Sequence, residues 1–374
     1  MNVVDLLLKL LSFESVTPDD AGSLKFIEEY LDGYEAIYVN KEGVKNLFLT
    51  KKFSNGPHLC FAGHVDVVPA GDGWETNPFV PVIKEGKIYA RGTQDMKSGV
   101  AAFVQACSEA DHFEGRLSIL LTSDEEGEAK YGTQIMLEHL KEIDLLPESC
   151  IVAEPTCENI FGDAIKVGRR GSINGVIEKH GMQGHAAYPE KATNPIHKVA
   201  QVLPSMAGVN LDEGDANFGP SQFVITDIRA GMEVTNVTPG KLKMMFNVRN
   251  STKTSIQDVE DFVHRYFSGM KYDLALSQSA KPFITETDRP VVHAIDESIK
   301  NVCGITPKHS TAGGTSDARF IAAYGIDVIE FGVINDTIHA PNERTSIEEV
   351  EKLHRVFSEL IFSTTLFAGE IVWR

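Results

Sequence analysis

The sequence predicts an α/β protein in which a mostly parallel sheet is sandwiched by helices and carries a second, smaller domain as an insertion. Three observations predict this fold class: apolar runs that end in polar residues, helical patterns between those runs, and a different order of elements from about residue 171 onward. With 374 residues, the chain is also longer than a single hydrophobic core usually grows, which favours two domains.

The first part of the chain, to about residue 170, alternates strands with helices. It opens with an amphipathic helical pattern in "MNVVDLLLKLLSFESV". Near-continuous apolar runs predict strands at 58–68, 117–123 and 150–155, because strands that are covered on both faces lack alternation. Apolar residues at helical spacing predict helices at 95–110 and 132–143. This alternation is typical of a parallel sheet with helices on both faces.

The order of elements changes between about residues 171 and 282. The patterns there predict strand, helix, strand, strand, helix and strand, at 172–180, 194–206, 221–230, 241–250, 255–269 and 272–280. This βαββαβ order matches a ferredoxin-like unit. A helix at 291–304, a strand at 327–333 and a terminal helix after "IHAPNERTS" then resume the first pattern. We therefore predict one discontinuous domain, 1–170 and 283–374, with residues 171–282 inserted into it.

Composition and charge exclude several classes of protein. The net charge is −18, from 53 acidic and 35 basic residues, which argues against nucleic acid or an anionic membrane as a partner. The five cysteines are widely spaced and form no C-x-x-C pair, so neither a disulfide framework nor a thiolate zinc site is expected. No signal peptide and no run of about 18 apolar residues is present, which predicts a cytoplasmic protein.

Side chains able to bind metal follow several of the predicted strands. They are His64, Asp66, Asp95, Glu125, Glu126, Glu154 and His339. Each has an ordinary reading by itself: an Asp before a helix is usually an N-cap, and adjacent glutamates usually form a solvated turn. The carboxyl ends of parallel strands meet at one edge of a sheet, however, where several carboxylates would repel one another unless a cation neutralised them.

The types of ligand indicate the kind of metal. Two histidines and three or four carboxylates without a thiolate favour zinc, with cobalt or manganese as substitutes. A two-metal site with a bridging carboxylate would use all of them. In "GHVD", His64 and Asp66 are two residues apart on a strand and share a face. We therefore expect the Asp66 carboxylate to accept the second ring N–H of His64 and fix its tautomer.

Seven stretches of the chain, in order, resemble the dizinc amidohydrolase family of aminoacylases, carboxypeptidases and deacylases. They are "GHVDVVP", "RGTQDMKSGVAA", "TSDEEG", "AEPT", "GHAAYP", "GGTSDARF" and "IHAPNE". The resemblance implies a dizinc peptidase-like catalytic domain with an inserted dimerisation and lid domain. It also implies hydrolysis of an amide, and a homodimer formed through the insertion.

The resemblance implies a role for each candidate ligand. Asp95 would bridge two Zn²⁺ ions. His64 and Glu154 would complete the ligands of one ion, and Glu126 and His339 would complete those of the other.

The resemblance also implies the catalytic groups. Glu125 would be the general acid and base, taking a proton from water and delivering it to the leaving amine. Asp66 is counted with the catalytic residues because of its expected contact with His64, which follows from the residue spacing and not from the resemblance. His185, in "GHAAYP", would reach into the partner's site and stabilise the oxyanion. The peptide bond between Asp95 and Met96 would be cis.

The substrate implied by the most similar members of this family is an acylated diamino diacid, which carries several carboxylates. Guanidinium groups bind carboxylates well, so Arg169, Arg170 and Arg249 are candidates, although Arg170 is equally explained as a surface ion pair. By resemblance, the pocket residues are Arg169, Tyr188, Asn236, Arg249, Thr315 and Asn335. The chain has Thr235 where these members usually carry an asparagine.

Two alternatives remain open at this point. A related deacylase or peptidase, such as an acetylornithine deacetylase or an aminoacylase, would use the same ligands with another acyl group. A non-catalytic metal-binding scaffold would have lost the base or a ligand, and none is missing here. The sequence has no phosphate-binding G-x-x-x-x-G-K-[ST] and no G-x-S-x-G nucleophile elbow, so it gives no support to a nucleotide enzyme or a serine hydrolase.

Overall fold

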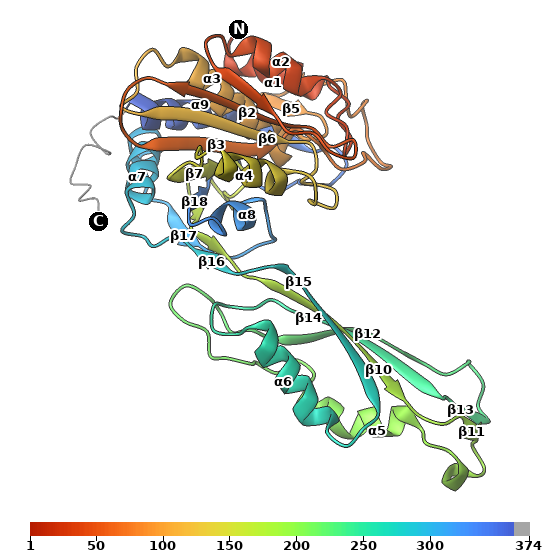
Figure 1. Ribbon diagram of the computed structural model, residues 1–374. Helices are drawn as coiled ribbons and strands as arrows, with labels where there is room; N and C mark the ends of the chain where they lie inside the picture. The colour runs from red at the N-terminus through yellow and green to blue at the C-terminus, as the bar shows by residue number, and fades with distance from the viewer. Residues whose placement is uncertain (363–374) are drawn as a thin grey trace. The chain divides into compact units, whose positions relative to one another are not determined.

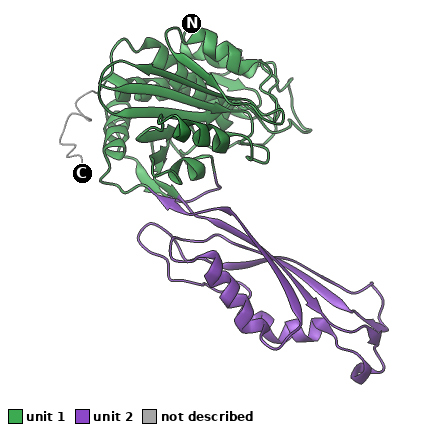
Figure 2. Ribbon diagram, in the orientation of Figure 1, with its two compact units in different colours: residues 1–168, 285–310, 316–374 green, residues 169–284, 311–315 purple. Residues whose placement is uncertain are grey.

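The computed structural model describes residues 1–362. The chain forms two compact units, which Figure 2 shows in different colours. Unit 1 comprises Met1–Gly168, Thr285–Ser310 and Ser316–Arg374, of which 363–374 lie outside the described residues. Unit 2 comprises Arg169–Ile284 and the short segment Thr311–Thr315. The expected insertion, 171–282, falls within the longer segment of unit 2, whereas the return of the chain at 311–315 was not expected.

Unit 1 is built on an eight-stranded sheet with the order β1–β2–β6–β3–β7–β18–β8–β17 (Figure 1). The strands are β1 (Glu35–Tyr38), β2 (Asn46–Lys52), β3 (His58–His64), β6 (Arg116–Thr122), β7 (Ser149–Val152), β8 (Ala164–Lys166), β17 (Lys308–Ser310) and β18 (Asp327–Glu330). Four neighbouring strands at the centre, β6, β3, β7 and β18, are parallel, and β1 and β2 are antiparallel. The predicted α/β class with a mostly parallel sheet is confirmed.

The helices of unit 1 cover both faces of this sheet. They are α1 (Val3–Leu11), α2 (Ser23–Tyr30), α3 (Ser98–Glu109), α4 (Thr133–Glu142), α7 (Pro290–Cys303), α8 (Ala318–Ala322) and α9 (Ile347–Phe362). Helices α1, α3, α7 and α9 pack together on one face, while α4 and α8 pack together on the other (Figure 1). The crossovers from β3 to β6 and from β6 to β7 step in opposite directions, so right-handed connections place α3 and α4 on opposite faces. Every residue of β3 is consequently buried.

A small three-stranded sheet lies beside the loops that carry two of the candidate ligands. Its strands are β4 (Val82–Lys84), β5 (Lys87–Tyr89) and β19 (Arg344–Ser346), with β5 in the middle. Strand β5 leads into the segment that ends at Asp95, and β19 begins shortly after His339. Because β5 and β19 are antiparallel partners, with Arg344 opposite Tyr89, they bring these two distant segments together.

Unit 2 is an antiparallel sheet with the order β12–β14–β10–β15, covered on one face by α5 and α6. Its elements are β10 (Ser172–His180), α5 (Pro195–Val202), β12 (Phe223–Ala230), β14 (Lys241–Val248), α6 (Ile256–Phe267) and β15 (Tyr272–Ala280). This order confirms the predicted ferredoxin-like βαββαβ insertion. Helix α6 begins with a capping box between Ser255 and Asp258 and buries Phe262 and Val263 against the sheet.

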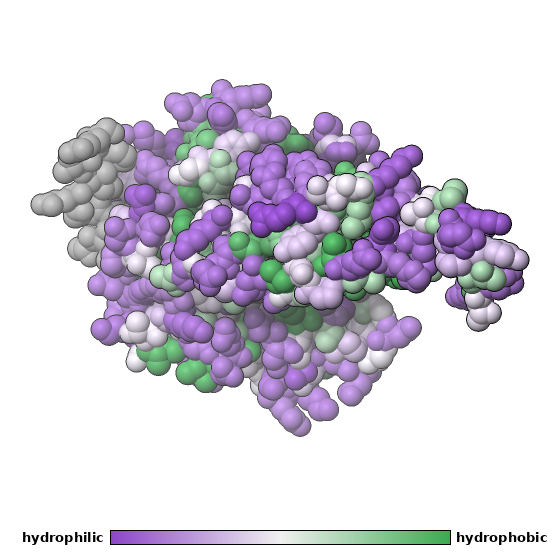
Figure 3. All heavy atoms as spheres, turned by 90° about the horizontal axis from the view of Figure 1, so that it is seen from below, coloured by the Kyte–Doolittle hydropathy of each residue, from purple (hydrophilic) through white to green (hydrophobic). Residues whose placement is uncertain are grey.

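The surface is polar over most of the view in Figure 3, where hydrophobic side chains occur in small separate groups. On the uncovered face of unit 2, Val224 and Met245 are at least a third exposed. No two cysteines, all of which lie within the described residues, form a disulfide. Within residues 1–362, no helix combines the length and the apolar character that crossing a membrane requires.

Candidate metal centre

The candidate ligands lie at the carboxyl edge of the central sheet of unit 1. His64 is the last residue of β3, Glu125 and Glu126 follow β6, and Glu154 follows β7. Because these three strands are parallel neighbours, their carboxyl ends lie at the same edge. The apolar runs that bury the strands therefore also place the polar residues that follow them side by side.

Asp95 comes from a tight turn, Thr93–Lys97, that precedes α3, and it lies between the two histidines. Its Oδ1 is 3.1 Å from His64 Nε2, and its Oδ2 is 3.3 Å from His339 Nε2. One carboxylate thus presents each of its oxygens to a different imidazole. The peptide bond between Asp95 and Met96 is cis, as the resemblance implied.

The three glutamates take different places around the histidines. Glu126 Oε1 is 2.9 Å from His339 Nε2, whereas Glu154 Oε1 is 3.8 Å from His64 Nε2. Glu125 Oε2 is 4.0 Å from His64 Nε2. The structure therefore brings all five predicted ligands together, with Glu125 beside them.

The tautomer of His64 is fixed differently from the expectation. Its Nδ1 donates a hydrogen bond to the backbone carbonyl of Asp66 at 2.9 Å, while the nearest carboxylate oxygen of Asp66 is 3.6 Å away. The Asp66 carboxylate instead accepts the backbone N–H groups of Glu125 at 3.4 Å and Glu126 at 3.1 Å. The predicted side-chain contact to the imidazole is wrong, because the carboxylate is engaged by the loop after β6. Asp66 holds that loop.

The electrostatics of the cluster reflect several carboxylates around two imidazoles. Burial favours a neutral Asp95, but hydrogen bonds from His339 and His64 outweigh it and hold the pKa of this carboxyl below its usual value. Hydrogen bonds to Asp95 and Glu126 raise the pKa of His339 to about 10. Burial raises the pKa of Glu125 to about 8, and burial followed by the nearby Asp95 raises that of Glu154 well above its usual range. Bound protons and a divalent cation are alternative ways to balance these charges.

The donor set fits a metal. With Nδ1 of His64 donating to a carbonyl, its Nε2 carries the lone pair that a metal needs, and this atom faces Asp95. Two ligands of one tetrahedral zinc, each at about 2.0–2.1 Å, lie roughly 3.3 Å apart. The observed spacings of 2.9, 3.1 and 3.3 Å between imidazole nitrogens and carboxylate oxygens agree with that value. Both His64–Asp95–Glu126 and His64–Glu125–Glu154 converge closely enough to hold an ion.

A sequence profile of peptidase family M20/M25/M40 matches residues 60–363, which is most of the chain. The chain belongs to this family.

Sequence relatives within the M20 family are similar over nearly their whole length. The succinyl-diaminopimelate desuccinylase of Sulfurovum sp. (strain NBC37-1) is 86% identical over 361 residues, covering 96% of this chain and 98% of that protein. The succinyl-diaminopimelate desuccinylase of a Nitratiruptor species is 73% identical over 363 residues, covering 97% of this chain and 100% of that protein.

Several solved structures share the fold of this chain at low sequence identity. The aminopeptidase PepT from Bacillus cereus ATCC 10987 has a TM-score of 0.81 at 20% identity, covering 97% of this chain and 98% of that one. The Bacillus subtilis YXEP protein, described as a dinuclear metal binding peptidase from the M20 family, has a TM-score of 0.71 at 14% identity, covering 98% of each chain. Membership of the family and the cluster of possible ligands together support a metal cofactor for this M20 protein.

The predicted substrate residues of this M20 chain fall into separate groups. In unit 2, Arg169 is buried and its Nη1 donates to the carbonyl of Ala312 at 2.9 Å, which places it at the segment Thr311–Thr315 that contains Thr315. Gly313, at φ +105, leaves room for this guanidinium.

A second group lies at the short strand pair β11 (Gly184–His185) and β13 (Val237–Thr238). The rings of His185 and Tyr188 are 5.7 Å apart, and the carbonyl of Asn236 accepts the N–H of Ala186 at 2.9 Å. Arg249 is exposed just after β14. Asn335 lies in unit 1, where its N–H donates to the carbonyl of Cys157 at 3.2 Å.

Two buried residues beside the metal centre were missed by the sequence reasoning. Arg91 and Glu343 form an ion pair at 2.8 Å within the loops that carry Asp95 and His339. Both stand inside the quoted motifs "RGTQDMKSGVAA" and "IHAPNE", yet neither was given a role. An arginine and a glutamate about 250 positions apart give no local signal of their pairing, and only their place within ligand-bearing motifs could have drawn attention to them.

Proposed function

We propose that this M20 protein is a succinyl-diaminopimelate desuccinylase. It hydrolyses N-succinyl-LL-2,6-diaminoheptanedioate with water to succinate and LL-2,6-diaminopimelate, a precursor of lysine and of the cell wall. The observation that carries the choice of substrate is the 86% identity, over 96% of the chain, to a relative of that name. The geometry of unit 1 supports the reaction class independently, because it combines a metal site with an adjacent carboxylate suited to acid–base work.

We further propose that the centre holds two Zn²⁺ ions per subunit, with Co²⁺ or Mn²⁺ as possible substitutes. His64 and Glu154 would serve one ion and His339 and Glu126 the other. Asp95 would serve both, because its two oxygens face the two imidazoles. Imidazole and carboxylate donors without thiolate support this choice of metals. When bound, such ions polarise the scissile carbonyl and lower the pKa of a water molecule.

Glu125 is the proposed general base and acid. It lies beside the ligands, and its nearest oxygen is 4.0 Å from His64 Nε2, so it is adjacent to the reacting centre. Its carboxyl is buried, and burial raises its pKa, so it binds a proton more readily than an exposed glutamate does. Glu125 takes a proton from the attacking water and then delivers it to the nitrogen of the leaving amine. Asp66 keeps this glutamate in place through the backbone of the loop.

Substrate recognition is proposed to depend on guanidinium groups. Arg169 is buried and already anchored by the carbonyl of Ala312, so its planar group is held in place for a carboxylate of the succinyl or diamino diacid portion. Arg249, Tyr188, Asn236, Thr315 and Asn335 remain proposed pocket residues. Thr235 stands where the most similar family members usually carry an asparagine, so no contact is proposed for position 235 and Asn236 is the proposed residue there.

The homodimer formed by unit 2 is also a proposal. Within it, His185 of one copy would stabilise the oxyanion in the partner's site. The support is chemical: His185 is exposed, and its Nδ1 accepts the N–H of Ala187 at 3.1 Å. In the neutral imidazole the proton then sits on Nε2, which makes that atom a hydrogen-bond donor. An oxyanion needs such a donor.

The deciding experiment is a panel of acylated amines tested on protein whose zinc content is measured in the same sample. We expect rapid release of succinate from N-succinyl-LL-2,6-diaminoheptanedioate, and much slower turnover of N-acetylornithine, N-acetylated amino acids and dipeptides. Preferential turnover of an acetylated substrate would instead identify an acetylornithine deacetylase or an aminoacylase. A zinc-loaded protein that turns over none of them would point to a binding scaffold.

A further inference from the structure

A buried ion pair lies directly behind the metal centre. Arg91 and Glu343 are 2% and 0% exposed, and their Nη1 and Oε2 atoms are 2.8 Å apart. Removing two charged groups from water costs desolvation free energy. The attraction between them offsets this cost only when further hydrogen bonds are made to both groups. The remaining bonds of this pair therefore show what it holds.

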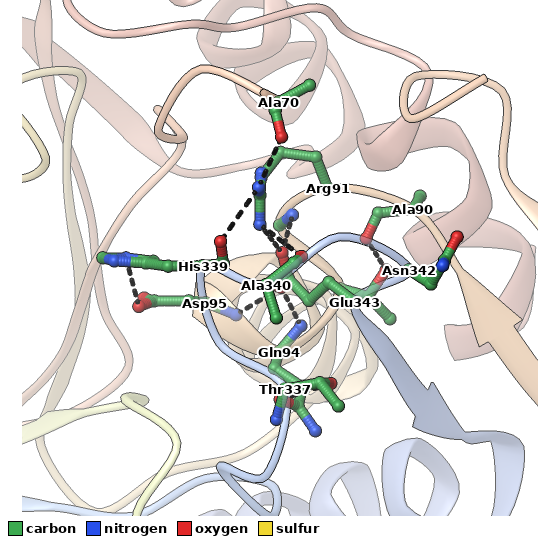
Figure 4. Close-up of polar contacts among 12 residues, drawn as sticks. Ala70, Ala90, Arg91, Gln94, Asp95, Thr337, His339, Ala340, Asn342 and Glu343 are labelled. Atoms are coloured by element: carbon green, nitrogen blue, oxygen red, sulfur yellow. Dashed lines mark hydrogen bonds and ion pairs between the residues drawn. The ribbon is translucent and has the colours of Figure 1, made fainter. Parts of the chain in front are cut away.

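Glu343 accepts hydrogen bonds from backbone N–H groups at and just before the turn that carries Asp95, the proposed bridging ligand. Its Oε1 accepts from Gln94 at 2.7 Å and from Asp95 at 3.1 Å, while its Oε2 accepts from Gly92 at 3.0 Å. Figure 4 shows Glu343 beside Asp95 and Gln94. A single side chain thus fixes the backbone of the turn at three positions, including that of the ligand itself.

Arg91 binds the other loop of the centre. Its Nη2 donates to the carbonyl of His339 at 3.3 Å and to that of Ala70 at 3.0 Å, and its Nη1 donates to the carbonyl of Ala340 at 3.3 Å (Figure 4). Ala70 belongs to the loop that follows His64 and Asp66. The guanidinium therefore joins the loop that follows His64 and Asp66 to the loop that carries His339.

His339 is the ligand that most needs such support. It lies in a loop between β18 and β19, its side chain is 50% exposed, and its φ is +58, a conformation that non-glycine residues adopt rarely. His64 and Glu154, by contrast, are fixed by the ends of β3 and β7. We propose that Arg91 and Glu343 are positioning residues that set the separation of Asp95 and His339, and thereby the affinity of the metal ion bound by His339 and Glu126.

This inference rests on the proposed two-metal centre, and Glu343→Gln tests it. In either orientation the amide presents its NH₂ group to two existing donors, either Arg91 and the N–H of Gly92 or the N–H groups of Gln94 and Asp95, so the turn shifts. Losing an outer-shell partner typically weakens metal binding 10–100-fold. We expect a loss of about that size for one of the two ions, whereas the ion held by His64 and Glu154 should be affected less.

The measurement is a titration of the metal-free protein with Co²⁺, followed by calorimetry and by the visible absorption of the bound ion. Neither readout requires a substrate. Wild-type protein should bind two ions in resolvable steps. Glu343→Gln should retain one step and show the other weakened, with an altered cobalt spectrum. Equal affinities and an unchanged spectrum would overturn the proposal.

Asp212→Asn is the matched control. Asp212 is also a carboxylate that organises a loop, since it accepts hydroxyl bonds from Ser221 and Thr254 at 2.6 Å and from Ser251 at 2.8 Å, but it lies in unit 2. The Asp212→Asn variant should have a lower melting temperature than the wild type, with unchanged affinities for both Co²⁺ ions. If both variants weaken cobalt binding alike, the effect is general destabilisation and the proposal fails.

Arg91→Lys provides a second reading if Glu343→Gln does not fold. Lysine keeps the charge near Glu343 but lacks the planar fork that reaches three carbonyls. It should weaken the same ion, and an unchanged cobalt titration for this variant would also refute the proposal. A wild-type protein that binds two ions but does not release succinate would contradict the proposed substrate and leave this inference standing.

Discussion

Gly332 is a position at which a single methyl group should disturb the metal centre through the backbone of a candidate ligand. It follows β18 and packs against the backbone that leads into Glu154. A Cβ added there would lie 2.8 Å from the carbonyl carbon of Glu154 and 2.9 Å from the carbonyl oxygen of Ala153, and closer still to the Glu154 oxygen. All three atoms are backbone, so no flexible side chain can move aside.

The size of the effect follows from these distances. Carbon atoms in contact prefer about 3.5–4.0 Å, so the Glu154 backbone must move by roughly 0.7 Å or more. Metal–ligand distances are held within about 0.2 Å. A misplacement near 1 Å can cost about 100-fold, which corresponds to roughly 2.7 kcal/mol. We therefore expect Gly332→Ala to weaken the ion bound by His64 and Glu154 by up to about that factor.

The assay is a zinc titration of the metal-free protein against a chromophoric chelator, with thermal unfolding recorded in parallel. Gly219→Ala is the control, because a Cβ at Gly219 meets nothing within 4 Å and its backbone is not in the left-handed region. If Gly332→Ala binds two zinc ions with wild-type affinity, the backbone of Glu154 is not held as the structure indicates, and the reasoning is refuted.

Three further predictions concern catalysis, binding and pH. Glu125→Gln should keep both metal ions and lower kcat about 10²–10⁴-fold, whereas Glu126→Ala should lose metal. Metal analysis alongside steady-state rates distinguishes the two effects. Loss of metal from Glu125→Gln would contradict the assignment of Glu125 as the base. Arg169→Lys should raise KM for the succinylated substrate at least tenfold while the zinc content stays constant, and an unchanged KM would exclude its role in binding. Burial lowers the pKa of His58 from 6.5 to about 4. The unfolded chain therefore takes up the proton first, and stability falls as pH drops from about 6.5 towards 4. Between pH 7 and pH 5, the free energy of unfolding measured in urea should fall by about 2 kcal/mol less for His58→Gln than for the wild type. Equal decreases in the two proteins would show that this histidine does not contribute to the pH dependence.

The sheet and the ligands were predictable because both depend on local patterns. The runs that became β3, β6 and β7 are apolar almost throughout, so their burial and their polar ends were visible in the sequence. Once the strands are parallel neighbours, His64, Glu125 and Glu154 must meet at one edge. The ferredoxin-like insertion was predictable for a similar reason, since the β10 and β15 segments alternate regularly.

The contacts that fix the ligands were not predictable, because they depend on which atom of a residue meets a distant partner. Residue spacing placed Asp66 and His64 on one face, but it could not show that the acceptor is a main-chain carbonyl. The pairing of Arg91 with Glu343 requires β5 to meet β19, two three-residue strands without a distinctive pattern. The return of 311–315 to unit 2 likewise leaves no periodic signal.

The division of tasks within Asp66 has a consequence for how this centre tolerates mutation. Its carbonyl oxygen serves His64, and its carboxylate serves the loop of Glu125 and Glu126. Every amino acid has the same main-chain carbonyl, so no substitution at position 66 removes the hydrogen-bond acceptor of the His64 imidazole. The hydrogen bond that orients His64 is thus retained when residue 66 is substituted, whereas the two backbone hydrogen bonds to the glutamate loop are lost with the carboxylate. A substitution of Asp66 can therefore impair proton transfer by Glu125 while His64 keeps the hydrogen bond that orients it.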